Sequence, residues 1–394
     1  IHPMIYLDSN ATTQIDPRVV EAMLPYLTEH YANPSSSYRA ARHVRQAVET
    51  AREQVAALIG CQTEELIFMS GGTESNNAAV FSALTLHAPN RQHLVTAKTE
   101  HSAVLEVAKR WVEEGHPTTF LEVDRGGTVH PESWTRCVQP GQTAVVSVMW
   151  ANNETGVIQP IEEIVKFVHD RGVLFHTDAV QAVGKLPISL KDLPVDYLSL
   201  TGHKFHAPKG IGALYVSKRV RFKAWMLGGG QESGRRSGTE NVPHIVGLGK
   251  AAELMREELA QGGDAKVREM RDAFESKVRA ALPETIVNSL SAIRLGTTSS
   301  LTFPGIDAPG MLILLDERGV ACSAGSACHT GALHPSHALE AMGLDAKHAA
   351  STLRFSWSRL NTMEETTQAA DLVIQCVHKM RELGGGDGDV VIQG

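Results

Sequence analysis

Residues 197–206 read YLSLTGHKFH, and this stretch decides which fold we expect the chain to adopt. The apolar run at 197–200 predicts a buried strand that ends at Thr201. Lys204 follows, so we expect its amine in a partly desolvated place just past a core strand. Desolvation favours the neutral amine, which can form a Schiff base with a carbonyl group. Thr201 and His203 could hold an anion beside it, such as a cofactor phosphate. The alternative is an ordinary loop lysine that points to water.

On both sides of this stretch, expected strands alternate with expected helices. Strands are predicted at 66–69, 94–96, 119–123, 143–149, 173–176, 197–200 and 213–216. Helices are predicted at 17–27, 37–59, 74–86, 103–113, 161–170 and 246–259, with a short one near Ser133. Strands separated by helices predict an α/β protein with a mostly parallel seven-stranded sheet covered on both faces. In such sheets ligands bind at the carboxyl ends of the strands.

A polar stretch at 261–264 predicts a hinge between a large and a small domain. Beyond it we expect helices at 267–282, 309–318 and 363–383, and strands near 300–303 and 353–356. That mixture predicts a smaller α+β domain. The large domain is expected to comprise residues 15–260, and the small domain residues 1–14 and 261–394.

The composition narrows the class of protein. The chain has 394 residues, of which 42% are hydrophobic and 21% charged, as in an ordinary globular protein. A net charge of -7 without a Lys/Arg run argues against a nucleic-acid partner. No apolar stretch is long enough to span a membrane, and the start lacks a signal-peptide pattern. Met4 could be the natural first residue. Five scattered cysteines indicate a protein of a reducing compartment, the cytoplasm. They lack zinc-ligand spacing, so we expect no metal site.

Polar clusters follow several of the expected strands. Residues 70–74 read SGGTE, where a strand ends and a helix begins. Free N–H groups at a helix start, together with the Thr73 hydroxyl, bind phosphate well, and Gly72 lets the backbone come close. A simple turn before a helix is the alternative.

Three further side chains stand at strand ends. Asp178 could face a ring nitrogen and keep it protonated, which makes a pyridine ring an electron sink, or it could cap a helix. Asn152 places a polar amide after the 143–149 strand. His101 could stack on a flat cofactor and move protons, although a lone histidine there is more often structural.

A second chemical stretch lies at 322–331, which reads CSAGSACHTG. Its small residues argue against burial, so we expect Cys328 to be a reactive thiol rather than a small core residue. Arg354, on the expected strand that follows, is suited to a bidentate grip on a carboxylate. The alternative is a surface arginine on an edge strand.

In this order the motifs match one family over nearly the whole chain. The chain resembles the cysteine desulfurases of the NifS/IscS type, which belong to the class-V aminotransferases and are pyridoxal-phosphate enzymes of fold type I. The motifs that carry the resemblance are YLDSNATT (6–13), NPSS (33–36), SGGTESNN (70–77), ANNETG (151–156), HTDAVQ (176–181), GHK (202–204), RSGTEN (236–241) and GSAC (325–328).

The resemblance implies a role for each matching residue. Lys204 binds pyridoxal phosphate as a Schiff base and, with Cys328 and His101, is catalytic; Cys328 attacks the substrate sulfur and becomes a persulfide. The implied cofactor-binding residues are Asp178 at the pyridine nitrogen, Gln181 at the ring hydroxyl, His101 stacked on the ring, Gly72, Thr73, Thr201 and His203 at the phosphate, Asn152, and Thr239 from a neighbouring subunit. The substrate carboxylate is held by Asn33, Asn152 and Arg354. The shared Thr239 implies a homodimer.

The expected reaction converts L-cysteine to L-alanine and passes the sulfur from Cys328 to an acceptor protein. Enzymes of this type serve iron–sulfur assembly, thiolation of transfer RNA, DNA sulfur modification and selenium metabolism, and the sequence does not name the acceptor.

His329 leaves a close alternative open. Housekeeping desulfurases carry Thr or Ser after the nucleophilic cysteine, whereas selenocysteine lyases resemble this chain in having Cys-His there. Against that alternative, animal lyases have an acidic residue where this chain has Ser102. A selenol has a lower pKa than a thiol and leaves more readily, so L-selenocysteine remains a candidate substrate.

Two readings from other classes explain less of the sequence. A non-catalytic sulfur-trafficking scaffold would not need Lys204, Asp178 and Cys328 intact. An ordinary aminotransferase gives no reason for the small-residue stretch at 323–331.

Overall fold

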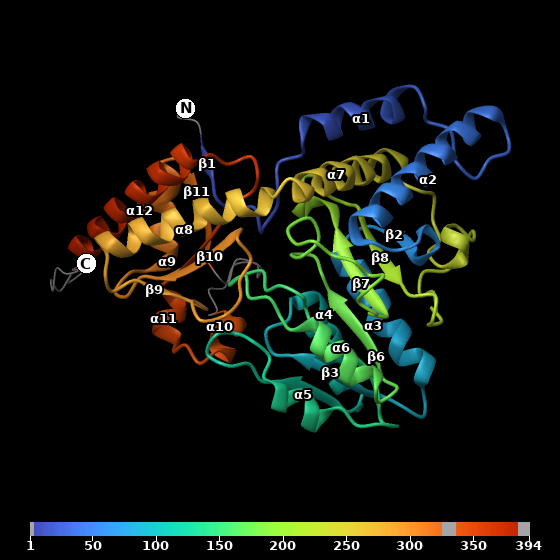
Figure 1. The fold of residues 1–394 in the computed structure, drawn as a ribbon, viewed down its shortest axis with the longest axis horizontal. Coiled ribbons are helices and arrows are strands. Elements are labelled where there is room, and N and C mark those ends of the chain that lie inside the picture. Colours follow the sequence, from blue (N-terminus) through green and yellow to red (C-terminus); the bar gives the residue numbers. More distant parts are fainter. Residues whose placement is uncertain (1–3, 325–335, 385–394) are drawn as a thin grey trace, which may run out of the picture.

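The centre of the larger lobe is a seven-stranded sheet (Figure 1). The computed structural model describes residues 4–324 and 336–384. The strands are β2 (Leu66–Met69), β3 (His93–Ala97), β4 (Thr118–Leu121), β5 (Thr143–Ser147), β6 (Leu174–Asp178), β7 (Tyr197–Thr201) and β8 (Gly212–Val216). Their order is β2-β8-β7-β6-β5-β3-β4, and β8 alone runs antiparallel to its neighbours. The predicted mostly parallel seven-stranded sheet is confirmed.

Helices cover both faces of this sheet, which is why its central strands are buried throughout. The helices of the lobe are α1 (Pro17–Thr28), α2 (Arg39–Ile59), α3 (Gly72–His87), α4 (Ser102–Glu113), α5 (Pro131–Cys137), α6 (Ile161–His169) and α7 (Val242–Ala260). Val145 packs in the core beneath α3 and α4, whereas its neighbour Val146 packs in the core beneath α2, α6 and α7. Alternate residues of one strand therefore serve two cores.

The smaller lobe has its own sheet and core. Its four-stranded sheet has the order β12-β13-β10-β9, and the N-terminal strand β1 pairs in parallel with β11. The elements are β1 (Ile5–Tyr6), α8 (Gly263–Ala281), β9 (Ile286–Val287), β10 (Thr298–Thr302), α9 (Ala308–Glu317), β11 (Val320–Ala321), β12 (Ser323–Ala324), α10 (His337–Ala341), α11 (Ala346–Ala350), β13 (Thr352–Ser356) and α12 (Met363–Gly384). Leu7 shares this core with Phe274 and Trp357. The chain's first strand therefore packs with its last third.

The expected α+β lobe is present, and the connection that leads into it is shorter than expected. Only Gln261 and Gly262 lie between α7 and α8, because α8 begins at Gly263, and the hinge expected at 261–264 stays a prediction. Gly262 has φ of 76°, a left-handed conformation that suits glycine and redirects the chain between the two helices. The division into residues 15–260 and residues 1–14 with 261–394 stays a prediction, since membership of a core does not test where a domain ends.

Within the described ranges, no helix is long and apolar enough to cross a membrane.

A close contact between α2 and α7 offers a test of how this lobe is packed. A β-carbon on Gly249 would lie 2.5 Å from Ala51 Cα, so α7 can approach α2 only because this position is glycine. We expect Gly249→Ala to lower the free energy of unfolding by about 1–3 kcal/mol, the usual cost of overpacking. Arg256→Ala, at an exposed position of the same helix, should change it by less than about 0.5 kcal/mol. Denaturant unfolding measures both, and equal stability of Gly249→Ala and the wild type would contradict the close approach.

Candidate active site at the carboxyl edge of the large sheet

Three elements meet at the carboxyl edge of the large sheet. β6 ends at Asp178 beside β7, with Asp178 paired to Ser199. The turn that opens α3 lies against both strand ends, since a β-carbon on Gly72 would lie 2.7 Å from Val180 Cγ2 and 3.7 Å from Thr201 Cβ. Glycine is therefore required there for the backbone to approach.

Asp178 is a buried carboxylate held by neutral donors. Its side chain accepts hydrogen bonds from Asn76 Nδ2 at 2.6 Å and from the Val180 backbone N–H at 2.9 Å. No ion pair of Asp178 is found among residues 4–324 and 336–384. A buried carboxylate with this environment is suited to a cationic ring nitrogen. Asn76, within the SGGTESNN motif, received no role from the sequence, although its position one turn into α3 was a usable signal.

The start of α3 offers an anion cradle. Gly71 precedes the helix and no side chain caps it, so the first N–H groups of α3 lack a capping partner. Thr201 Oγ1 donates to the Ile211 carbonyl at 3.1 Å and lies 3.7 Å from a β-carbon built on Gly71. Thr73 is exposed on the first turn. Glu74 on that turn pairs with Arg236 at 2.9 Å, which offsets a negative charge beside the cradle.

His101 stands at the start of α4 as a neutral ring. Its Nδ1 accepts the Ala103 N–H at 3.1 Å, which leaves the proton of the neutral ring on Nε2. Burial lowers the pKa of His101, and the charge of Lys204 lowers it further, against an opposing effect of Asp178. The preceding Glu100 is fully buried, and burial raises its pKa well above the ordinary value. The ring therefore faces the site without a charge of its own.

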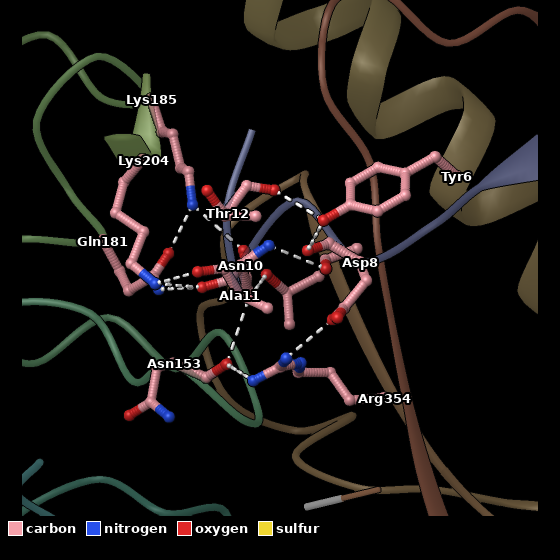
Figure 2. A network of polar contacts seen from close by, with 12 residues as sticks. Tyr6, Asp8, Asn10, Ala11, Thr12, Asn153, Gln181, Lys185, Lys204 and Arg354 are labelled. Carbon is pink, nitrogen blue, oxygen red and sulfur yellow. Dashed lines mark hydrogen bonds and ion pairs between the residues drawn. The ribbon is translucent and has the colours of Figure 1, made fainter. Parts of the chain in front are cut away.

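Lys204 follows β7 on a short 3-10 turn, η2 (Gly202–Lys204). Its Nζ donates to the Asn10 carbonyl at 2.5 Å and to the Ala11 carbonyl at 2.7 Å (Figure 2). His203 is anchored to the same N-terminal segment, because its carbonyl accepts from Thr13 N at 2.9 Å. Burial, with a further contribution from Lys204, lowers the pKa of His203 to about 4. The histidine beside the lysine is thus neutral at physiological pH.

Asn10 is the residue that sequence reasoning missed most clearly. It is 1% exposed, and its carbonyl accepts from Gln181 Nε2 at 3.0 Å as well as from Lys204. Its Nδ2 donates to the Asn153 carbonyl at 3.1 Å and to Thr298 Oγ1 at 2.9 Å. One side chain and one carbonyl therefore join both lobes. The signal available was a polar residue in the YLDSNATT motif, without a role attached.

Arg354 lies in the same network (Figure 2). Its Nη2 donates to Asp8 Oδ1 at 2.8 Å and its Nη1 to the Asn153 carbonyl at 3.0 Å, while its buried Nε finds no partner in the described part of the chain. Arg354 is buried on the inner strand β13, so the alternative of a surface arginine on an edge strand is wrong, and its grip on a substrate carboxylate stays a prediction.

The described residues that flank the cysteine stretch both reach this site. Ser323 on β12 pairs with Arg354 on β13. On the other side, Ser336 Oγ donates to the buried Glu154 carboxylate and His337 Nε2 contacts the Glu100 carbonyl at 2.9 Å. Cys328 itself lies outside the described residues.

Three residues to which the resemblance gives a role lie outside the hydrogen-bond network around Lys204 and Arg354. Asn152 is buried; its Oδ1 accepts from the N–H groups of Glu154 and Thr155, each at 2.9 Å, and its Nδ2 donates to the Thr99 carbonyl at 3.1 Å. Asn33 is exposed in the loop between α1 and α2, far from the small lobe in Figure 1. Thr239 is exposed beside a cavity that it lines with Ser70 and Arg236. Within this chain, Asn33 and Arg354 are not brought together.

The described residues fit pyridoxal phosphate. The fit rests on the space that Gly72 leaves at the start of α3 and on the buried Asp178 without a cationic partner among the described side chains. A phosphate suits the first feature, and a protonated pyridine nitrogen suits the second. Neutral His101 offers a flat ring, and Lys204 an amine.

Comparison with known proteins gives the family. The family model described as aminotransferase class-V matches residues 5–368. The chain is 46% identical over 380 residues to a cysteine desulfurase of Trichormus azollae, covering 96% of this chain and 94% of that protein. It is 42% identical over 390 residues to the cysteine desulfurase NifS of Azotobacter vinelandii, covering 98% and 96%. A solved structure described as a NifS-like protein matches with a TM-score of 0.89 at 35% identity, covering 95% of this chain and all of that one. With the family model spanning almost its whole length, this chain belongs to the class-V aminotransferase family.

Proposed function

We propose that the chain is a pyridoxal-phosphate-dependent cysteine desulfurase, which converts L-cysteine to L-alanine and carries the sulfur as a persulfide on Cys328. The observation that carries the proposal is the meeting of Lys204, Asp178 and the start of α3 at one sheet edge. It occurs in a chain that aligns over almost its full length with cysteine desulfurases.

The cofactor would be held by residues from several elements. Lys204 would bind it covalently, Asp178 would pair with its ring nitrogen, Gln181 would donate to its ring oxygen and His101 would stack on its ring. Gly72, Thr73, Thr201 and His203 would hold the phosphate, with Asn152 nearby and Thr239 from a second subunit. When bound, pyridoxal phosphate supplies an electron sink beside the α-carbon of the substrate.

Lys204 would take the α-proton of the substrate on Nζ. Two backbone carbonyls aim this amine, and carbonyl oxygens carry no formal charge, so they orient it without forming an ion pair. Asn76 supports Asp178 in the same way, because its Nδ2 fixes one carboxylate oxygen and leaves the negative charge in place. Backbone carbonyls thus orient Lys204, and a neutral amide orients Asp178.

Arg354 would bind the substrate carboxylate together with Asn152. The third residue that the resemblance implies, Asn33, does not lie beside Arg354 within this chain. The Arg354 guanidinium is buried and bonded on both Nη atoms, which fixes its plane, while Nε stays without a described partner. The Cys328 thiolate would then attack the substrate sulfur, and the carbon–sulfur bond would break as the sulfur–sulfur bond forms. Both described flanks of the 325–335 segment lie at the site, which supports this role.

A selenocysteine lyase is the second candidate, favoured by one observation, the His329 that follows Cys328. Such an enzyme would release selenium from L-selenocysteine, and a better leaving group would make it less dependent on the cysteine.

The setting of the reaction is also part of the proposal. We infer a cytoplasmic homodimer in which Thr239 completes the site of the neighbouring subunit, and a protein acceptor that takes the sulfur or selenium. Thr239 is exposed on this chain, which supports a role towards a second copy.

Replacement of Lys204 tests the covalent role. We expect Lys204→Ala to lower alanine formation by roughly a thousandfold or more, because no other group supplies both the amine and the proton transfer. Release of alanine from L-cysteine is the measurement. Lys191→Ala, at an exposed lysine, should retain wild-type activity. Wild-type turnover by Lys204→Ala would refute the assignment.

Replacement of Cys328 separates cofactor binding from sulfur transfer. Cys328→Ala should lose cysteine desulfuration yet keep the absorbance of the bound cofactor, because the thiol contacts the substrate sulfur and not the cofactor. Cys137→Ala should behave as the wild type. Full-rate desulfuration by Cys328→Ala would show that another group accepts the sulfur.

The ratio of alanine formed from L-selenocysteine and from L-cysteine distinguishes the two candidate functions. We expect the wild type to use L-cysteine. Cys328→Ala should lose more of its activity on L-cysteine than on L-selenocysteine, because the selenol leaves more readily. A wild type that turns over L-selenocysteine alone would identify a lyase.

A further inference from the structure

Lys185 lies beside the site without a role in the reaction described so far. It follows the turn that leaves β6, and its Nζ donates to Asn10 Oδ1 at 3.0 Å and to Gln181 Oε1 (Figure 2). Gly184, with φ of 77°, sets this turn against the residue after Lys204, because a β-carbon there would lie 2.8 Å from Phe205 Cβ. The two lysines are therefore held in fixed relation.

The contacts of Lys185 determine which way two amides face. An amide side chain has a donor end and an acceptor end, and only the acceptor end can receive an N–H from Lys185. Gln181 must therefore turn its oxygen to Lys185, which leaves its Nε2 to donate to the Asn10 carbonyl at 3.0 Å. Asn10 likewise turns Oδ1 to Lys185, which leaves its Nδ2 for the Asn153 carbonyl and Thr298.

We propose that Lys185 is a positioning residue that fixes the Gln181 amide with its N–H groups towards Lys204 and the bound cofactor. This inference rests on the proposed function, in which Gln181 donates to an oxygen of the cofactor ring. Without Lys185, the amide loses one of the two contacts that distinguish its ends, and only the Asn10 carbonyl still selects this orientation. A reversed amide would present a lone pair to the Asn10 carbonyl and to the ring oxygen, and both contacts would repel.

Lys185 can act as this donor without a charge. Burial lowers the pKa of its amine well below the ordinary value, and Lys204 and Arg354 lower it further. His203 and His206 also face it, while Glu258 and Asp264 line the cavity beside its stem. A neutral amine has two N–H groups, which equals the number of amide oxygens it contacts. The arrangement supplies hydrogen bonds without adding a second cation next to Lys204.

A double-mutant cycle in cofactor binding tests the proposal. Apoprotein is titrated with pyridoxal phosphate, and the dissociation constant and the pH midpoint of the absorbance change of the bound cofactor are measured. We expect Lys185→Met and Gln181→Ala each to weaken binding about tenfold, and the double variant to be no weaker than either alone. The pH midpoint should move in the same direction and by the same amount in all three. Lys191→Met, an exposed lysine, is the matched control and should bind as the wild type.

The outcomes separate the possible failures. Effects that multiply to about a hundredfold in the double variant would overturn the proposal, as would unchanged binding by Lys185→Met. If Lys185→Met does not fold, Lys185→Gln in the wild-type and Gln181→Ala backgrounds gives the same cycle, and equal effects in both backgrounds would overturn it. A wild type that binds no pyridoxal phosphate would refute the proposed function itself.

Discussion

The site depends on the hydrogen bonds that hold Lys204 Nζ to the carbonyls of Asn10 and Ala11. Amines and a guanidinium gather at this edge of the sheet, and each would be costly to bury without acceptors. The chain supplies the acceptors mainly as neutral oxygens, from backbone carbonyls and from the amides of Asn10 and Gln181. Of the carboxylates nearby, Asp8 pairs with Arg354, and Asp178 is left for the proposed contact with the ring nitrogen.

These acceptors are supplied by a segment that belongs to the core of the smaller lobe. β1 pairs with β11, Asp8 pairs with Ser356, and the Asn10 N–H is bonded to Ser356 Oγ at 2.9 Å. The position of Asn10 is thus set by one lobe, whereas the side chains it receives come from the other. A shift between the lobes would therefore change the environment of Lys204 directly.

Local patterns were enough to predict most of the fold and part of the site. Strand–helix alternation gave the sheet, and the rule that ligands bind at carboxyl ends brought Lys204, Asp178 and Gly72 together. The contacts of Asn10, Lys185 and Asn76 escaped prediction because they join residues far apart in the chain or depend on which end of an amide faces inward. Neither property has a periodic signature. The connection between α7 and α8 is shorter than the polar stretch at 261–264 because a polar, glycine-rich run also suits a helix start.

The sequence separations in this network also determine when the site can be completed as the protein is made. Asn10 leaves the ribosome early, yet its partners Thr298 and Ser356 lie 288 and 346 residues further along the chain. At roughly 5–20 residues per second, synthesis of those partners follows by tens of seconds. Until then, the segment that orients Lys204 has no sheet to dock on. The large sheet can fold first, but the contacts that orient Lys204 can be completed only late in translation.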